Sequence, residues 1–168
     1  MPRAIALFDE AAKASSDSAA AYAAAQLVAA QGDQAGAKQR LEAIVASDPG
    51  NAGARNDLAW MLAQSGQDLD RALALAEAAN RIQPSPEIAD TLGFVHLQRG
   101  SADKAVELFQ QALEQRPTSA TIRYHLGLAL GKQGDKGRAL ETLRKALETG
   151  PFPEAEAAKS ELARLEAQ

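Results

Sequence analysis

Small apolar residues recur along the chain at a spacing of 34 residues, and they predict a repeated helical hairpin. In most units the small residue follows a leucine, as in Leu92-Gly93, and the series is Ala25, Ala59, Gly93 and Gly127. A second series of nearly the same spacing consists of Ala37, Ala72, Ala105 and Ala139. Two helices approach closely where a side chain is small, so we expect the two series to face each other where the paired helices cross.

Turn-forming residues recur with the same period and mark the ends of the expected helices. The first helix of each unit should end at a glycine in the left-handed conformation, at Gly32, Gly66, Gly100 and Gly134. A residue that can cap the second helix follows, as Asp33, Asp68, Ser101 and Asp135. A proline then stops the second helix, at Pro49, Pro84, Pro117 and Pro151. The second unit carries one extra turn residue, Gln67, and the loop Pro84-Ser85-Pro86 is one residue short.

The order of these positions resembles the tetratricopeptide repeat (TPR) family. The third unit shows the pattern most fully, with Leu92-Gly93, His96, Ala105, Phe109, Ala112 and Pro117. The resemblance covers roughly residues 18–153 and implies an all-α solenoid of antiparallel helical hairpins in a right-handed superhelix. Stretches such as Arg123-Tyr124-His125-Leu126 are similar to the C-terminal repeats of bacterial TPR proteins, among them those of exopolysaccharide and PEP-CTERM sorting systems.

The resemblance divides the chain into six segments and predicts nine to ten helices. We expect one TPR solenoid over residues 1–168, made of an N-terminal helix (2–17), repeat 1 (18–51), repeat 2 (52–85), repeat 3 (86–119), repeat 4 (120–153) and a capping helix (154–168).

The two ends of the chain differ in pattern. The last helix has one apolar stripe, Ala155, Ala158, Leu162 and Leu165, and is otherwise polar, as the cap of a solenoid should be. At the other end, Ala4, Phe8 and Ala11 match the slots of a second helix. This helix is either half of a repeat that belongs to a longer protein or an N-terminal cap. In both cases we expect Ile5, Leu7 and Phe8 to cover repeat 1 only in part, and self-association through this end.

Composition narrows the classes of function. The chain carries 18 basic and 22 acidic residues, a net charge of −4, which does not favour a nucleic-acid partner. It has no cysteine, no apolar run long enough for a membrane span and none of the common catalytic motifs. We therefore expect no enzyme activity, cofactor or metal, and a soluble protein of the cytoplasm or periplasm without a targeting signal.

The TPR resemblance implies that the first helices line a concave groove. Residues beside each Leu-small pair should point into it, and the expected set is Tyr22, Gln26, Asn56, Asp57, Trp60, Asp90, Thr91, Phe94, Tyr124, His125 and Leu128. Four of the seven aromatic residues belong to this set, so they are either anchors for a partner or fillers between alanine-rich helices. The middle of the groove should be acidic, through Asp57, Glu87 and Asp90, and its C-terminal end neutral to basic, through Arg123, His125 and Lys132. Such a groove does not suit the C-terminal carboxylate that chaperone-binding TPR domains hold.

These observations lead to two hypotheses for function. The first is a non-catalytic scaffold that holds a peptide or helix of a partner protein in the groove, without nucleic acid or membrane insertion. The alternative is a structural segment that assembles with copies of itself or continues a longer TPR protein.

Overall fold

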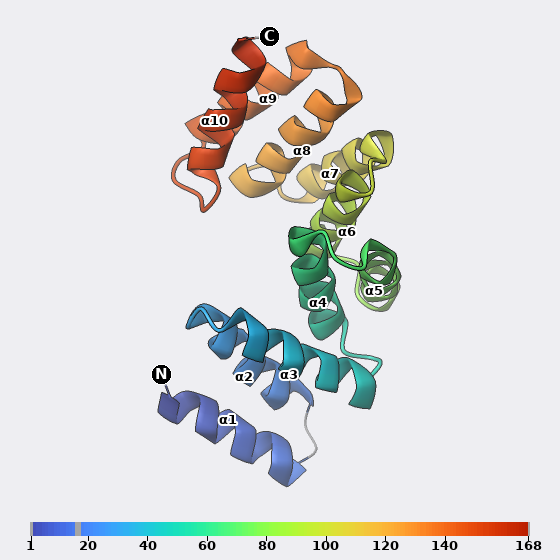
Figure 1. Ribbon diagram of the computed structural model, residues 1–168, viewed down its shortest axis with the longest axis vertical. Helices are drawn as coiled ribbons and strands as arrows, with labels where there is room; N and C mark the ends of the chain where they lie inside the picture. The colour runs from blue at the N-terminus through green and yellow to red at the C-terminus, as the bar shows by residue number, and fades with distance from the viewer. Residues whose placement is uncertain (1, 16–17, 168) are drawn as a thin grey trace. The chain divides into compact units, whose positions relative to one another are not determined.

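The computed structural model describes residues 2–15 and 18–167, and every regular element in this part of the chain is an α-helix (Figure 1). The ten helices are α1 Pro2–Ser15, α2 Ser18–Ala30, α3 Gln34–Ser47, α4 Ala52–Ser65, α5 Leu69–Ile82, α6 Pro86–Gln98, α7 Ala102–Gln115, α8 Ala120–Gln133, α9 Lys136–Glu148 and α10 Ala155–Glu166. The predicted all-α fold and its number of helices are confirmed. Residues 16–17 of the expected N-terminal helix and residue 168 of the expected cap lie outside the described residues.

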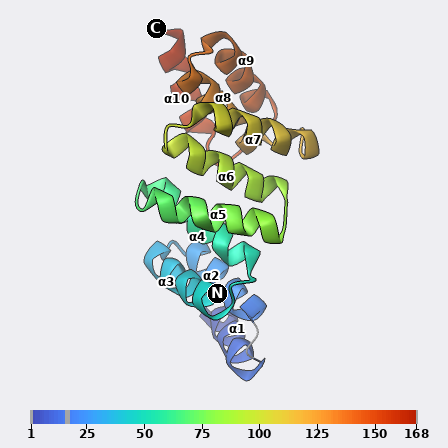
Figure 2. The same ribbon diagram turned by 90° about the vertical axis from the view of Figure 1, so that its right-hand side faces the viewer.

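The helices form two compact units, one ending at Gln83 and the other beginning at Pro84. In the first unit α1 packs on α2, α2 on α3, α3 on α4 and α4 on α5. In the second unit α6 packs on α7, α7 on α8, α8 on α9 and α9 on α10. Figure 2 shows the pair α6 and α7 lying side by side. Each helix therefore contacts the helices that precede and follow it within its unit, as in a repeat protein.

The small residues of the first series lie where paired helices cross. A Cβ atom added at Gly93 of α6 would be only 2.8 Å from Cε1 of Phe109 on α7. The same addition at Gly127 of α8 would be 2.7 Å from Leu143 on α9. Phe109 and Leu143 are completely buried. The absence of a side chain is thus what lets these helix pairs approach.

The turns follow the predicted chemistry with one exception. All four glycines of the turn series have positive φ angles. The carboxylates of Asp33, Asp68 and Asp135 each accept a hydrogen bond from a backbone N–H in the first turn of the next helix, but Ser101 makes no such bond. The extra residue Gln67 shifts Asp68 into the left-handed region, at φ 46°. Asp68 is the one described non-glycine residue with positive φ, so the insertion is absorbed in the turn and not in the helices.

The terminal helices pack differently from each other. Ala158 and Leu165 of α10 are buried, as the predicted cap requires. At the other end, Arg40 of α3 donates two hydrogen bonds to Asp9 of α1, at 2.5 and 3.0 Å. Leu7 is 59% exposed and Phe8 39% exposed, so apolar surface remains on α1, as the expected partial cover of repeat 1 implies. None of the helices within the described residues is long and apolar enough to span a membrane.

Gly93→Leu should lower the free energy of unfolding by about 1–3 kcal/mol, the cost of an overpacked core, because the new side chain meets the Phe109 ring. Urea denaturation measures the change. Gly131→Ala is the matched control on α8, since its Cβ would have ordinary contacts of 3.6 Å or more and alanine favours a helix. A loss below about 0.5 kcal/mol for Gly93→Leu, within the usual scatter of surface substitutions, would show that the crossing tolerates a side chain.

Candidate partner-binding surface

The expected groove residues of the first unit form a hydrogen-bonded cluster between α2 and α4. The Tyr22 hydroxyl donates to Asp57 Oδ2 at 2.7 Å and accepts from Gln26 Nε2 at 2.9 Å. Asn56 Nδ2 donates to Asp57 Oδ1 at 3.3 Å, so both carboxylate oxygens are engaged. The Tyr22 ring lies on Gly53, where an added Cβ would be 2.7 Å from the ring. Tyr22 and Asp57 therefore tie α2 to α4.

This cluster changes the acidity of the tyrosine. Burial raises the pKa of Tyr22 well above its usual range, and the adjacent carboxylate of Asp57 raises it further. The neutral hydroxyl is the form that can donate to Asp57, so the hydrogen bond adds to the rise in the pKa that burial causes. Buried Asn56 Oδ1 has no hydrogen-bond partner among the described residues.

A hollow of about 350 Å³ opens beside this cluster. Its walls are formed by helices α2, α3 and α4. The lining residues are Ala25, Gln26, Ala29, Gln34, Leu41, Asp57, Trp60, Met61 and Gln64. Trp60 is half-buried, and Gln26, Gln34 and Gln64 are exposed at the rim. The hollow thus combines an apolar wall, three amide side chains and one carboxylate.

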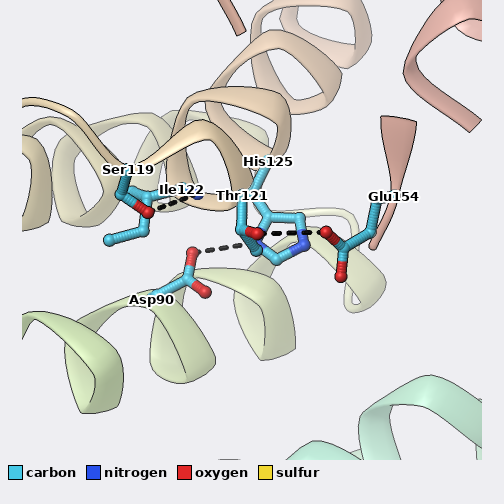
Figure 3. A network of polar contacts seen from close by, with 6 residues as sticks. All are labelled: Asp90, Ser119, Thr121, Ile122, His125 and Glu154. Carbon is cyan, nitrogen blue, oxygen red and sulfur yellow. Dashed lines mark hydrogen bonds and ion pairs between the residues drawn. The ribbon is translucent and has the colours of Figure 1, made fainter. Parts of the chain in front are cut away.

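The second unit buries most of its expected groove residues. His125 is 1% exposed, and Asp90, Thr91 and Phe94 are buried as well. His125 Nδ1 lies 2.8 Å from Asp90 Oδ1 (Figure 3). A carboxylate can only accept, so Nδ1–H is the donor. The sequence predicts that these four side chains point into the groove, but the structure buries them instead. The pairing satisfies the polar groups of Asp90 and His125 and so allows both to be buried.

Aromatic rings surround the buried histidine. The centroids of Phe94, Phe109 and Tyr124 lie 5.2, 5.6 and 5.5 Å from that of His125. Nearby, Thr121 Oγ1 donates to Glu154 at 3.0 Å, which ties α8 to the segment before α10 (Figure 3). The His125 cluster is therefore a packed part of the core of this unit.

The two clusters occupy equivalent places in the repeat. Tyr22 and Asp90 lie three residues before the small residue of their units, and their partners Asp57 and His125 lie two residues before the small residue of the next unit. Both pairs are separated by 35 residues. The sequence therefore contains a signal for these pairs, namely a hydrogen-bond donor 35 residues away from an aspartate. The signal is visible only when two successive repeats are compared.

Of the remaining expected residues, Gln26, Trp60 and Leu128 lie one place after the small residue, and Tyr124 lies three places before it. Leu128 lines a second hollow of about 450 Å³ with Leu97, Gln98, Gly100, Ala102, Lys132, Glu161 and Arg164. Tyr124 is half-buried, with its ring 6.3 Å from that of Phe152, and burial raises its pKa with help from Glu161 and Glu154. Gln26 and Trp60 hold the same place as Leu128 in their own repeats. Positions before the small residue therefore join helices, whereas three of the four positions after it line a hollow.

The expected charge pattern is largely satisfied within the chain. Glu87 forms an ion pair with Arg116 at 2.7 Å, and Asp90 is paired with His125. Arg123 donates to the carbonyl of Pro117 and to Thr149 Oγ1. The described residues hold no group of three or more acidic or histidine side chains arranged for a metal ion. Asp57 and Lys132 are the members of the expected charge pattern that line the hollows.

Comparison with solved structures places this architecture among helical-repeat proteins. A thermophilic TPR protein of Thermus thermophilus superposes with a TM-score of 0.73 at 25% identity, over 98% of this chain and 89% of that chain. YrrB, described as a TPR protein with an unusual peptide-binding site, gives 0.70 at 18% identity over 95% and 82%. MamA gives 0.68 at 22% identity over 92% and 89%. The fold defines the class as a solenoid of helical hairpins.

Sequence comparison gives the family. Family models described as TPR repeat or tetratricopeptide repeat match residues 22–85, 93–134 and 120–149. The chain belongs to the tetratricopeptide repeat family, whose members are generally non-catalytic scaffolds that bind other proteins or peptides.

Curated relatives are much longer than this chain. Human Protein IFIT1 homolog B is 31% identical over 93 residues, which are 55% of this chain and 20% of that protein. A TPR repeat-containing protein of Pseudomonas aeruginosa is 29% identical over 107 residues, 63% of this chain and 18% of that protein. The chain spans about a fifth of the length of these relatives.

Asp90→Ala should lower the free energy of unfolding by about 1–3 kcal/mol, because it leaves the buried Nδ1–H of His125 without an acceptor. Asp90→Asn is the matched control, since its carbonyl oxygen can still accept, and it should lose less. Urea denaturation of both variants checks the order. Equal stability of Asp90→Ala and the wild type would contradict the structural role of the pair.

Tyr22→Phe should make stability less sensitive to alkaline pH. The folded chain raises the pKa of Tyr22 above the ordinary value of about 10, so ionisation favours the unfolded chain above that pH. The contribution of Tyr22 is complete below about pH 10 and is lost as the pH rises further. Unfolding measured between pH 8 and about 11 should show a steeper decline for the wild type than for Tyr22→Phe. Parallel declines would be inconsistent with the burial of this hydroxyl against Asp57.

Proposed function

We propose that this chain is a non-catalytic scaffold that binds an extended peptide of a partner protein in the hollow beside Trp60. The observation that carries the proposal is the half-buried indole in the wall of a 350 Å³ hollow. This volume is near the lower end of the roughly 300–1,000 Å³ typical of ligand pockets. Tryptophan in such a position is a frequent anchor of protein interfaces.

The rim of the hollow favours a peptide with unpaired backbone groups. Gln26, Gln34 and Gln64 each present an amide that can donate and accept hydrogen bonds. An extended peptide offers free N–H and C=O groups, whereas a helix has already paired most of its own. The glutamines therefore suit an extended segment better than a helix.

Charge at the hollow favours a basic side chain in the peptide. The Asp57 carboxylate lines the hollow, and a Lys or Arg near it would also lie against the indole of Trp60. The carboxylate accepts bonds from Tyr22 and Asn56, so it is held in place before a peptide arrives. YrrB, described as having an unusual peptide-binding site, shares its fold with this chain at 18% identity. The similarity concerns the fold alone.

Trp60→Ala should weaken peptide binding by about tenfold or more, the effect of losing an anchor. The peptides would be selected from a displayed random library on the whole chain and measured by titration calorimetry. The single tryptophan gives a second readout, because its fluorescence should change on binding. Glu77→Ala on the exposed side of α5 is the control and should bind as the wild type does.

Three results would count against this proposal. Selected peptides without enrichment of Lys or Arg would contradict the role of Asp57. Unchanged affinity of Trp60→Ala would move the site away from this hollow. Loss of folding in Trp60→Ala, seen by circular dichroism, would assign the indole to the core instead.

A further inference from the structure

Helix α1 repeats a stripe that is buried elsewhere in the chain. Its residues Ala4, Leu7, Phe8 and Ala11 match Ala105, Leu108, Phe109 and Ala112 of α7 in type and in spacing. All four residues of α7 are buried, and Phe109 is in contact distance of Gly93 on α6. On α1, by contrast, Leu7 is 59% and Phe8 39% exposed. The same stripe that receives a helix on α7 is thus only partly covered on α1.

Leu7 and Ala11 of the stripe lie away from the surface that holds α1 in its own unit, and Ala4 and Phe8 lie at its border. Ile5 is half-buried, and Asp9 is bound by Arg40 of α3. These two residues are one turn apart on a side of the helix different from that of Leu7. Figure 1 shows α2 and α3 on one side of α1 only. A further helix can therefore dock on the stripe without displacing α2.

The order of residues in the stripe is the same in both directions. It reads small, large, large, small from Ala4 to Ala11, and its centre lies between Leu7 and Phe8. In an antiparallel pair about this centre, Leu7 faces the partner subunit's Phe8 and Ala4 faces the partner subunit's Ala11. Such a self-complementary patch is the requirement for a two-fold interface.

Charges along the edge of the stripe select the same arrangement. Arg3 and Glu10 are exposed and seven residues apart, so they lie on one edge of the helix, at its two ends. An antiparallel copy brings Arg3 beside the partner subunit's Glu10, and the reverse pair forms by symmetry. A parallel two-fold copy would place the two charged edges on opposite sides of the interface, so only the antiparallel copy pairs these charges. We propose that two copies of this chain associate through α1, antiparallel and centred between Leu7 and Phe8.

Association should be measured by sedimentation velocity and light scattering on the whole chain. From about 1 µM to about 1 mM, the range of weak to moderate interfaces, the wild type should shift from monomer to dimer. Phe8→Glu should raise the dimer dissociation constant by about tenfold or more, because it places a carboxylate in the centre of the apolar stripe. Ile82→Glu makes the same kind of change at an equally exposed apolar residue of α5 and should leave the dissociation constant unchanged.

Charge reversal tests the antiparallel register without disturbing the fold, because both residues are exposed. Arg3→Glu and Glu10→Arg should each weaken self-association by about fivefold, through like charges at both ends. An equal mixture of the two variants should form a heterodimer, and the double variant should regain wild-type association.

Several outcomes would overturn the proposal. A wild type that stays monomeric over the whole range would leave the stripe to a helix of another protein. Dimers that persist in Phe8→Glu would place the interface elsewhere. Mixed charge variants that fail to pair would exclude the antiparallel register.

Discussion

The close approach of two helices at a residue without a bulky side chain is the contact on which the architecture depends. At Gly93 the ring of Phe109 occupies the space that a Cβ would need, and at Gly127 Leu143 does the same. Because the crossing recurs at a constant position, the first helices of neighbouring repeats within each unit present corresponding residues to each other. The Tyr22–Asp57 and Asp90–His125 bonds are possible only in this fixed register.

In this register, different positions of the first helix have different roles. Polar residues before the small residue bond to the neighbouring repeat, which fixes the positions of their side chains; one of them, Asp57, also lines a hollow. Residues just after the small residue, such as Trp60 and Leu128, line the hollows. Buried polar pairs bring specificity at modest net stability, whereas half-buried apolar residues next to a hollow can contribute to affinity. Adjacent positions of one helix thus hold the repeats together and line the hollows.

The sequence predicts the helices well because their signals are local. Glycine at the turn, aspartate at the cap and proline after the second helix each act within a few residues, and the structure places them as expected, apart from the missing bond at Ser101. The burial of Asp90 and His125 could not be predicted from each repeat alone. A polar residue is expected at the surface unless the residue that forms a hydrogen bond with it is known. The pattern around Phe8 is that of a core residue, but no helix of the described residues covers it completely, and this depends on packing that the local pattern does not contain.

The two inter-repeat bonds run in opposite directions. In one, the earlier repeat supplies the donor, Tyr22, and in the other it supplies the acceptor, Asp90. Repeat 3 placed before repeat 2 would bring Asp90 against Asp57, and repeat 1 placed before repeat 4 would leave Tyr22 facing His125 with no carboxylate. Such mismatches cost stability, because buried polar groups lose their partners. The repeats are therefore not interchangeable modules, and the polar pairs encode the order in which they can be joined, which limits any shuffled or extended array built from this chain.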